Sequence, residues 1–341
     1  MKAVVFHQRG EVSVEEQPQP GIEQAGDAVV RVTLSALSCL DVAAYMGRRP
    51  RHPGPIGHEL VGVIEAVAPD VTRLKPGQRV VSPPATFCGG CFYCKQGLLS
   101  ACGQRHVYGV DLPGAQAEYV RVPSADAVLE PLPAAISDEQ AIFLAELMPS
   151  VLWGLEAAAV NAGDSVIVLG CGPTGLSSVL LARTMGAGQL FAIDHHDYRL
   201  AAAAALGATA LNFEDEGVLK RVKAVTDGRG ADIVVEAAGK AEALRDAIDL
   251  VRPYGTVVSL GSIDATADAP VGGLLAKQAR LVGAGAAPVK NYMGRVAKMM
   301  ARGVINPAPI ISHTLPLVEA PAAYRLVGQR RDGALKVLLR P

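Results

Sequence analysis

The pattern of hydrophobic positions changes once along the chain, after about residue 137. Before that point, short runs rich in β-branched residues are separated by Gly and Pro, as at residues 29–34, 60–67 and 79–82. Such runs predict strands, and Lys75-Pro-Gly-Gln78 predicts a turn between two of them. The first part of the chain is therefore expected to be a β-rich domain covering residues 1–140.

In the second part, strand-like and helical stretches alternate. Ser137-Asp-Glu-Gln140 has the form of a helix-capping start, and residues 144–160 form an apolar helical stretch interrupted at Pro149. A helix is expected over residues 176–185. The predicted strands are residues 165–169, 189–194, 232–236, 255–260 and 279–282. This alternation predicts a parallel, doubly wound sheet, in a domain covering residues 141–290.

The end of the chain returns to the pattern of its beginning. A helix is expected through residues 296–300, and a strand over residues 334–339. We therefore expect residues 291–341 to complete the first domain. The chain as a whole is predicted to be an α/β protein in which a nucleotide-binding domain interrupts a β-rich one.

Charge and hydropathy argue against some classes of partner. The net charge of the 341 residues is −1, so a nucleic-acid or membrane-surface partner is not expected. No run of 18 apolar residues is present, and the first residues lack the apolar core of a signal peptide. A cytoplasmic enzyme acting on a small molecule is the expectation.

Four of the six cysteines lie close together, at Cys88, Cys91, Cys94 and Cys102. With a Gly-rich stretch between them, four thiolates at this spacing predict a closed tetrahedral zinc site in a lobe over residues 85–105. Such a site has no open coordination position, so the metal would be structural. Two disulfides or a reducible thiol cluster are the alternatives.

A glycine-rich turn joins the strand at 165–169 to the following helix. Its sequence is Gly170-Cys-Gly172-Pro173-Thr174-Gly175. After a strand and before a helix, this pattern predicts a dinucleotide-binding turn, in which the glycines admit the pyrophosphate and the helix amides face it.

Asp194 ends the next predicted strand, 19 residues after Gly175. A carboxylate there can accept hydrogen bonds from the adenosine ribose and would repel a 2′-phosphate, which favours NAD over NADP. Arg199 is a candidate cofactor contact, although an exposed, solvated side chain is an equal reading. His195 and His196 are expected to flank the adenine as surface residues.

Together these motifs resemble the zinc-containing medium-chain alcohol dehydrogenases, and within them the formaldehyde, threonine and polyol dehydrogenase group. Gly57-His58-Glu59, residues 74–80, the four cysteines and the glycine turn carry the resemblance. It implies a GroES-like catalytic domain, a Rossmann domain, a cleft between them, and a homodimer or homotetramer. It also implies NAD, zinc and a small alcohol or carbonyl substrate.

The resemblance fails at the first ligand of the catalytic zinc. Aligned on Asp41, the family's ligand cysteine falls on Ser38, and Cys39 is one residue out of register. The two positions that carry the alcohol proton in relatives fall on Leu40 and Ala43. The remaining implied ligands are His58 and Glu146, with Glu59 behind them.

The resemblance assigns two further residues. Ser150 falls where relatives have a small hydroxyl residue near the nicotinamide. Lys336 falls where relatives have a basic residue near the pyrophosphate. With Ser38 a poor ligand, three forms of the catalytic site stay open. It can be a weaker nitrogen-and-oxygen metal site, a site with Cys39 turned inward, or a metal-free acid–base pair of Glu146 and His58.

The leading functional hypothesis is an NAD-dependent oxidoreductase that interconverts an alcohol or polyol and its aldehyde or ketone. Reduction of an activated C=C bond is the alternative in another reaction class. The loss at Ser38 and Leu40 is compatible with it, but the four cysteines and Asp194 argue against it. A catalytically decayed NAD-binding protein is the third hypothesis.

Overall fold

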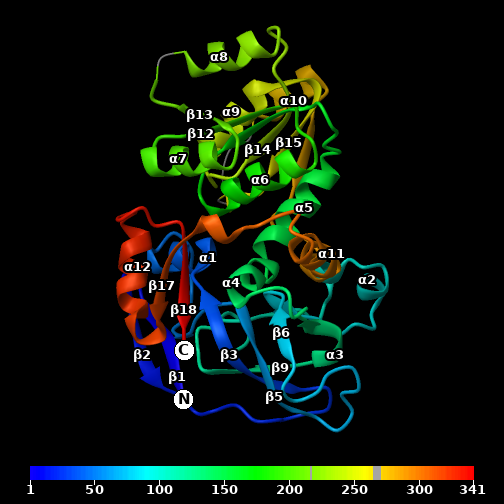
Figure 1. Ribbon diagram of the computed structural model, residues 1–341, viewed down its shortest axis with the longest axis vertical. Coiled ribbons are helices and arrows are strands. Elements are labelled where there is room, and N and C mark those ends of the chain that lie inside the picture. Colours follow the sequence, from blue (N-terminus) through cyan, green and yellow to red (C-terminus); the bar gives the residue numbers. More distant parts are fainter. Residues whose placement is uncertain (216, 264–269) are drawn as a thin grey trace. The chain divides into compact units, whose positions relative to one another are not determined.

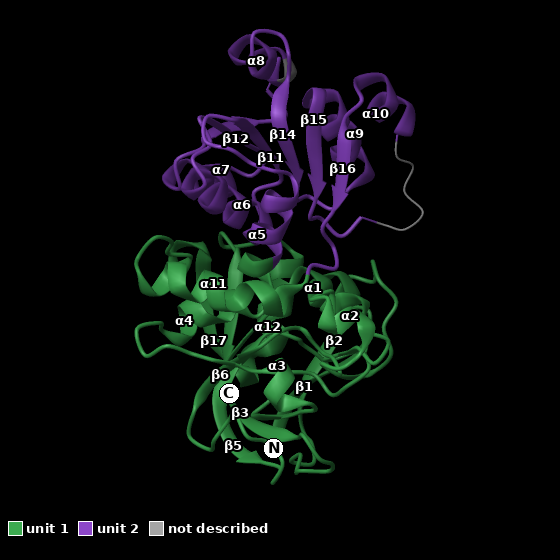
Figure 2. Cartoon of the chain, turned by 90° about the vertical axis from the view of Figure 1, so that its right-hand side faces the viewer, with its two compact units in different colours: residues 1–149, 288–341 green, residues 150–287 purple. Residues whose placement is uncertain are grey.

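The computed structural model describes residues 1–215, 217–263 and 270–341. Two compact units make up the chain, shown in two colours in Figure 2. Unit 1 combines residues 1–149 and 288–341, and unit 2 comprises residues 150–287. Each unit has sheets of its own. The expected pairing of a β-rich fold with a doubly wound α/β fold is confirmed.

Unit 1 is built mainly of strands. Its largest sheet has the order β10-β6-β5-β3-β18-β17, with β9 also paired to β3. The strands of unit 1 are β1 Lys2–Gln8, β2 Glu11–Glu16, β3 Ala28–Ala36, β4 Gly54–Pro55, β5 Leu60–Val67, β6 Arg79–Ser82, β7 Ala85–Thr86, β8 His106–Val107, β9 Tyr119–Val122, β10 Glu130–Pro131, β17 Ile311–Pro316 and β18 Lys336–Arg340. Its helices are α1 Cys39–Tyr45, α2 Phe92–Lys95, α3 Ala125–Val128, α4 Asp138–Ala141, α11 Val289–Ala301 and α12 Ala320–Gly328. The 3₁₀ turns are η1 Leu99–Ala101, η2 Ile142–Leu144, η3 Ala308–Ile310 and η4 Leu317–Glu319.

The last strand joins the two ends of the chain. In β18, Leu338 pairs with Ala36 and Leu339 with Ser35, both of β3, in antiparallel register. The same strand is parallel to β17. The tail therefore completes the first sheet, as expected, and places Lys336 beside residues near the start of the chain.

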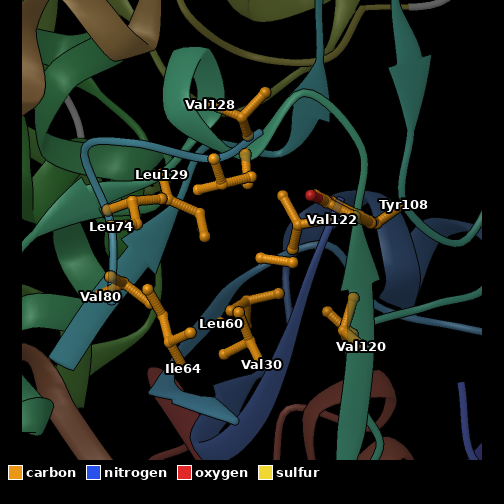
Figure 3. Close-up of a cluster of buried hydrophobic side chains, with 14 of the residues drawn as sticks. Val30, Leu60, Ile64, Leu74, Val80, Tyr108, Val120, Val122, Val128 and Leu129 are labelled. Carbon is orange, nitrogen blue, oxygen red and sulfur yellow. The ribbon is translucent and has the colours of Figure 1, made fainter. Parts of the chain in front are cut away.

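One apolar core lies against β3, β5 and β9 (Figure 3). Val30, Leu60 and Leu129 are fully buried there, and Ile64 is 1% exposed. Burying such side chains is the main favourable term in folding. Tyr108 is also fully buried. Its hydroxyl oxygen accepts a hydrogen bond from Ser82 Oγ at 3.2 Å, so the polar end of the side chain has a partner.

Unit 2 contains a six-stranded sheet in the order β13-β12-β11-β14-β15-β16. Strands β12, β13, β14 and β15 of this sheet are labelled in Figure 1. Every neighbouring pair is parallel. The strands are β11 Ser165–Leu169, β12 Gln189–Asp194, β13 Thr209–Asn212, β14 Ala231–Glu236, β15 Val251–Ser259 and β16 Arg280–Gly283. The helices between them are α6 Pro173–Thr184, α7 Asp197–Ala205, α8 Val218–Val225, α9 Ala241–Leu250 and α10 Val271–Lys277.

Helix boundaries confirm one local prediction and correct another. Ser137 caps α4 with a complete capping box, in which Gln140 is the reciprocal partner. The expected break at Pro149 is wrong, because α5 Leu147–Ala157 runs through it. Pro149 is the third residue of that helix, where the missing N–H has no intrahelical acceptor to lose. Among the described residues, no helix combines the length and the apolar character needed to cross a membrane.

Asp232 joins three neighbouring strands of unit 2 at one carboxylate. Its Oδ2 accepts bonds from the backbone N–H and hydroxyl of Ser165, at 2.8 and 2.6 Å, and its Oδ1 accepts one from Arg252 Nε at 2.6 Å. Burial raises the pKa of Asp232, but Ser165 and Arg252 outweigh this and lower it to about 2.

Replacing Asp232 by Asn should reduce the free energy of unfolding of unit 2 by about 1–3 kcal/mol at neutral pH, since a charged acceptor is lost. A depressed pKa stabilises the fold above the ordinary value of 3.8, and the contribution disappears as pH falls through about 2. The difference between the two proteins should therefore shrink below pH 3.8 in denaturant titrations. Asp227→Asn, at a side chain 88% exposed, is the control. A difference that stays constant with pH would contradict this account.

Candidate functional site

His58 and Glu146 meet inside unit 1, although 88 residues separate them. His58 lies between β4 and β5, and Glu146 lies between η2 and α5. The distance from His58 Nε2 to Glu146 Oε2 is 3.0 Å. Gly57 permits this approach: its φ is +98°, and a Cβ there would lie 2.5 Å from Gln116 Cγ. Only glycine fits that position.

The other nitrogen of His58 faces Asp41. His58 Nδ1 is 3.7 Å from Asp41 Oδ1, an oxygen that is buried and has no hydrogen-bond partner. Asp41 Oδ2 accepts bonds from the hydroxyl of Ser38 at 2.9 Å and from Gln116 Nε2 at 3.4 Å. An oriented carboxylate behind a histidine is the usual support of a metal-binding imidazole.

Ser38 serves as the N-cap of α1. Its hydroxyl accepts the backbone N–H of Asp41, and the Asp41 carboxylate accepts the backbone N–H of Ser38 in return, which completes a capping box. Ser38 is 4% exposed. The Ser38 hydroxyl therefore both donates a hydrogen bond to Asp41 and accepts one from it. Its role in this structure is to hold Asp41, the carboxylate that faces His58.

Lys336 and Glu59 form a buried ion pair beside this site. Both side chains are 3% exposed, the ammonium of Lys336 donates to Glu59 Oε2, and it also donates to Leu37 O at 3.3 Å. The resemblance had assigned Lys336 to the cofactor pyrophosphate. The structure gives it a different partner, because β18 carries it into the interior of unit 1.

The charges around His58 perturb its proton affinity and that of its neighbours. Burial lowers the pKa of His58, but the carboxylates of Asp41 and Glu146 outweigh it and raise the pKa to about 9. Burial raises the pKa of Glu59. Burial also acts to raise the pKa of Glu146, yet His58, Lys336 and Arg105 together lower it below its ordinary value. Without a metal, His58 is thus an imidazolium held between carboxylates at neutral pH.

Three candidate metal ligands converge here. His58, Glu59 and Glu146 each offer a ligand atom, and these atoms lie within 4.8 Å of one another. One imidazole nitrogen and two carboxylate oxygens suit zinc or a harder divalent cation. Cys39 is not part of this group among the described residues; it is the first residue of α1 and is exposed.

The four-cysteine lobe presents a second, separate set of ligands. The sulfurs of Cys88, Cys91, Cys94 and Cys102 lie within 4.8 Å of one another, and none is paired in a disulfide. The Sγ of Cys88 is 3.9 Å from that of Cys94 and 3.7 Å from that of Cys102. Backbone N–H groups of Gly90 and Cys91 lower the pKa of Cys88 to about 6, which favours its thiolate. The donor set fits a closed zinc site.

The glycine turn of unit 2 has the geometry expected of a dinucleotide loop. Gly170 has φ +91°, Gly172 is the N-cap of α6, and Pro173 and Thr174 form the first turn of that helix. A Cβ on Gly175 would lie 1.8 Å from Gly170 O, so the helix packs on the strand only because this residue is glycine. At Gly172 a Cβ would meet only Arg199 Nη1, at 4.0 Å. The helix N-terminus is therefore open to a ligand.

Asp194 ends β12 and faces this turn. Its Oδ2 accepts the backbone N–H of Cys171 at 2.8 Å, and its Oδ1 accepts those of His195 and His196 at 2.8 and 3.1 Å. Arg199 Nη1 lies 3.6 Å from Oδ2. Burial acts to raise the pKa of Asp194, but these donors lower it, so it is an anion at neutral pH.

Other predicted positions are less informative. Ser150 is a half-buried residue of α5 in unit 2. His195 and His196 are half-buried rather than exposed, with ring centroids 3.8 Å apart.

Sequence reasoning did not assign the contacts of Asp41 with His58 or of Lys336 with Glu59. The Ser38-x-x-Asp41 spacing was a visible signal of a helix start. The long-range partners gave no local signal.

Comparison with known proteins agrees with this geometry. Residues 24–134 match the alcohol dehydrogenase GroES-like domain, and residues 173–302 match the zinc-binding dehydrogenase model. An uncharacterised zinc-type alcohol dehydrogenase-like protein of Bacillus subtilis is 33% identical over the full length of both chains. The chain belongs to the zinc-type alcohol dehydrogenase family.

Two further relatives of this alcohol dehydrogenase-family chain are close. Zinc-type alcohol dehydrogenase B of Aspergillus flavus is 41% identical over 76% of this chain and 63% of that protein. The structure of alcohol dehydrogenase TADH from Thermus sp. ATN1 superposes with a TM-score of 0.94 and 39% identity, covering 100% of this chain and 99% of the other. The predicted family and the class of oxidoreductase are thereby confirmed.

The two glycines of the turn should respond differently to substitution. Gly175→Ala should lower the unfolding temperature by several degrees, because the added Cβ overlaps Gly170 O. Gly172→Ala should leave that temperature unchanged, since its Cβ meets open space, but should weaken NADH binding about tenfold or more by blocking the pyrophosphate. Calorimetric unfolding and NADH fluorescence titration measure the two effects. Unaltered NADH affinity in Gly172→Ala would show that the dinucleotide binds elsewhere.

Proposed function

We propose that this alcohol dehydrogenase-family protein interconverts an alcohol or polyol and its aldehyde or ketone, using NAD as the hydride carrier. The observation that carries the proposal is the convergence of the buried His58 and Glu59 with the half-buried Glu146 in a GroES-like unit. Unit 2 supports it with an open glycine turn and an ionised Asp194. We assign the catalytic domain to residues 1–140 and 291–341, and the NAD-binding domain to residues 141–290.

NADH held at the glycine turn and Asp194 would supply the hydride for carbonyl reduction, and the protein would have to supply a proton to the carbonyl oxygen. His58 can supply that proton, because Asp41 and Glu146 keep it protonated at neutral pH. Glu146, whose side chain is 28% exposed, compensates the positive charge of the imidazolium before the proton is transferred, and His58 is neutral afterwards. In the oxidation direction the same imidazole takes the proton back. Leu40 and Ala43, which cannot carry protons, leave this pair as the proposed proton route.

We propose that His58, Glu59 and Glu146 bind a divalent metal only in place of the His58 proton, and far more weakly than the lobe does. Three features weaken metal binding at this site. The Ser38 hydroxyl is hydrogen-bonded to Asp41, and Lys336 forms an ion pair with one oxygen of Glu59. The raised pKa of His58 means that a metal must displace a proton from the imidazole. A bound metal would polarise the substrate oxygen as a Lewis acid. Cys39 is left outside the ligand set.

We assign the lobe to one structural zinc and the adenosine end to NAD rather than NADP. Four thiolates favour a closed zinc site, and a reducing, cytoplasmic compartment suits their unpaired state. The negative charge of Asp194 would repel a 2′-phosphate, while Arg199 lies close enough to touch the cofactor. We further propose a homodimer or homotetramer, which the edge position of β16 in its sheet supports.

His58→Ala should abolish NADH-dependent reduction of aldehydes and ketones, by about 100-fold or more, since the proton donor is lost. NADH consumption with a panel of aldehydes, ketones and enones measures this, with NADH binding checked separately so that folding is controlled. Turnover of enones alone would favour C=C reduction, and unchanged turnover in His58→Ala would refute the assigned centre. Tighter binding of NADPH than NADH would contradict the role of Asp194.

Zinc content should identify the weak ligand position. The purified protein should hold about one zinc per chain, in the lobe, and Ser38→Cys should raise this toward two by adding a thiolate. The same change should cost about 1 kcal/mol of stability, because the N-cap of α1 is lost. Cys39→Ser is the matched control and should leave zinc content unchanged. Two firmly held zincs in the native protein, with Ser38 remote from the second, would contradict the proposal.

A further inference from the structure

Six basic side chains are gathered on two stretches of unit 1, residues 48–52 and 105–106. We call them the basic rim. Arg51 is half-buried and the others are exposed; the rim consists of Arg48, Arg49, Arg51, His52, Arg105 and His106. Across residues 46–53 and 103–112, the sequence contains a single acidic residue, Asp111. The concentration of positive charge is notable in a chain whose net charge is −1.

The two stretches of the rim are joined next to His58. Arg51 Nη2 donates to Gly109 O and, at 3.4 Å, to Pro55 O. Gly109 in turn packs against the backbone of Gly57, since a Cβ on Gly109 would lie 3.0 Å from Gly57 N and 2.7 Å from Arg51 Nη2. Gly57 directly precedes His58. The guanidinium of Arg51 is therefore connected to His58 through two intervening residues, Gly109 and Gly57.

The rim also acts electrostatically on the residues around His58. Arg105 is among the groups that hold the pKa of Glu146 below its ordinary value, after His58 and Lys336 have offset the effect of burial. Burial lowers the pKa of Arg51, and the negative charge of Asp41 opposes that change. One cation from each stretch is thus within electrostatic range of a carboxylate that faces His58.

The rim lacks the acidic partners that some arginines of unit 1 have. Arg79 pairs with Asp138 at 2.5 Å, Arg121 with Asp27 at 2.7 Å, and Arg31 with Glu65 at 3.7 Å. Within the described part of the chain, no ion pair involves Arg48, Arg49 or Arg105. Asp111 is engaged elsewhere, because its Oδ2 accepts the backbone N–H of Val107 at 2.9 Å. Like charges held together without an acid are available to bind an anion.

We infer that the basic rim binds an anionic group of the substrate, so that the preferred substrate carries a carboxylate or a phosphate in addition to its reacting hydroxyl or carbonyl. This inference rests on the proposed function, because it places the reacting carbon at His58. Arginine suits the role, since its planar guanidinium matches both carboxylate and phosphate oxygens. A small anion is favoured over a polyanion because the rim is confined to two short stretches that adjoin His58.

Pairs of substrates, of which one member carries an anionic group and the other is neutral, test the inference. Oxidation by NAD is compared for glycerol and glycerol 3-phosphate, and for 1,3-propanediol and 3-hydroxypropanoate. The anionic member of at least one pair should have a kcat/KM about tenfold higher or more at low salt. That advantage should decline at about 0.5 M salt, since exposed charges are screened. The pair that shows it distinguishes phosphate from carboxylate recognition.

Two variants locate the effect. Arg48→Gln and Arg49→Gln should each reduce kcat/KM for the anionic substrate about tenfold, mainly through KM, and leave both the neutral substrate and NADH affinity unchanged. Arg31→Gln, at an arginine paired with Glu65, is the control and should change neither. Equal turnover of charged and neutral members, or equal losses for both, would overturn the inference. So would tight binding of a heparin oligosaccharide without any preference for small anions.

Binding measurements separate this inference from the proposed function. Calorimetric titration of the NADH-loaded protein with glycerol 3-phosphate and 3-hydroxypropanoate needs no turnover. Binding that is lost in Arg48→Gln and Arg49→Gln, in a protein that oxidises none of the four alcohols and reduces no aldehyde or ketone of the panel, would support the anion site and refute the dehydrogenase activity. Turnover of neutral alcohols without anion binding would support the activity and refute the anion site.

Discussion

The placement of a buried histidine between two carboxylates determines much of unit 1. His58 is 4% exposed, with Glu146 at one ring nitrogen and Asp41 facing the other. Charges removed from water are tolerated only when they are paired and hydrogen-bonded. The surroundings supply this pairing: α1 begins with a box that orients Asp41, η2 leads into Glu146, and β18 brings Lys336 to Glu59. The last strand and the first helix of the chain therefore both contribute to the surroundings of His58: β18 supplies Lys336, and the start of α1 orients Asp41.

Departures from the family pattern acquire a physical meaning in this arrangement. A cysteine at position 38 would be a soft ligand, whereas Ser38 is an N-cap that fixes the carboxylate behind His58. The observed role of Ser38 is thus to position the carboxylate that faces the imidazole. The same carboxylates that raise the pKa of His58 to about 9 also compete with any metal, because a ligand nitrogen must first lose its proton. The four-cysteine lobe is independent of this balance, since its ligands are separate.

Sequence pattern was sufficient where local signals determine structure. The strands at Ser165–Leu169 and Gln189–Asp194 were predicted with their observed ends, because each is a short apolar run that adjoins a glycine in the sequence. Pro149 misled, since its position in the first turn of α5 depends on where that helix starts. The pairing of Lys336 with Glu59 could not be predicted locally: 277 residues separate them, and only the β3–β18 register brings them together. Resemblance located His58 and Glu146, but not the charge state that Asp41 imposes.

The central claim is that hydride reaches a carbonyl carbon at a centre organised by His58. The most direct test is to follow deuterium from NADH labelled at C4 into the product, by NMR, with an α,β-unsaturated ketone as substrate. The account predicts that deuterium appears on the carbinol carbon, that the C=C bond is retained, and that no label is transferred in His58→Ala. Deuterium on the β-carbon of a saturated ketone would contradict the account and establish C=C reduction instead.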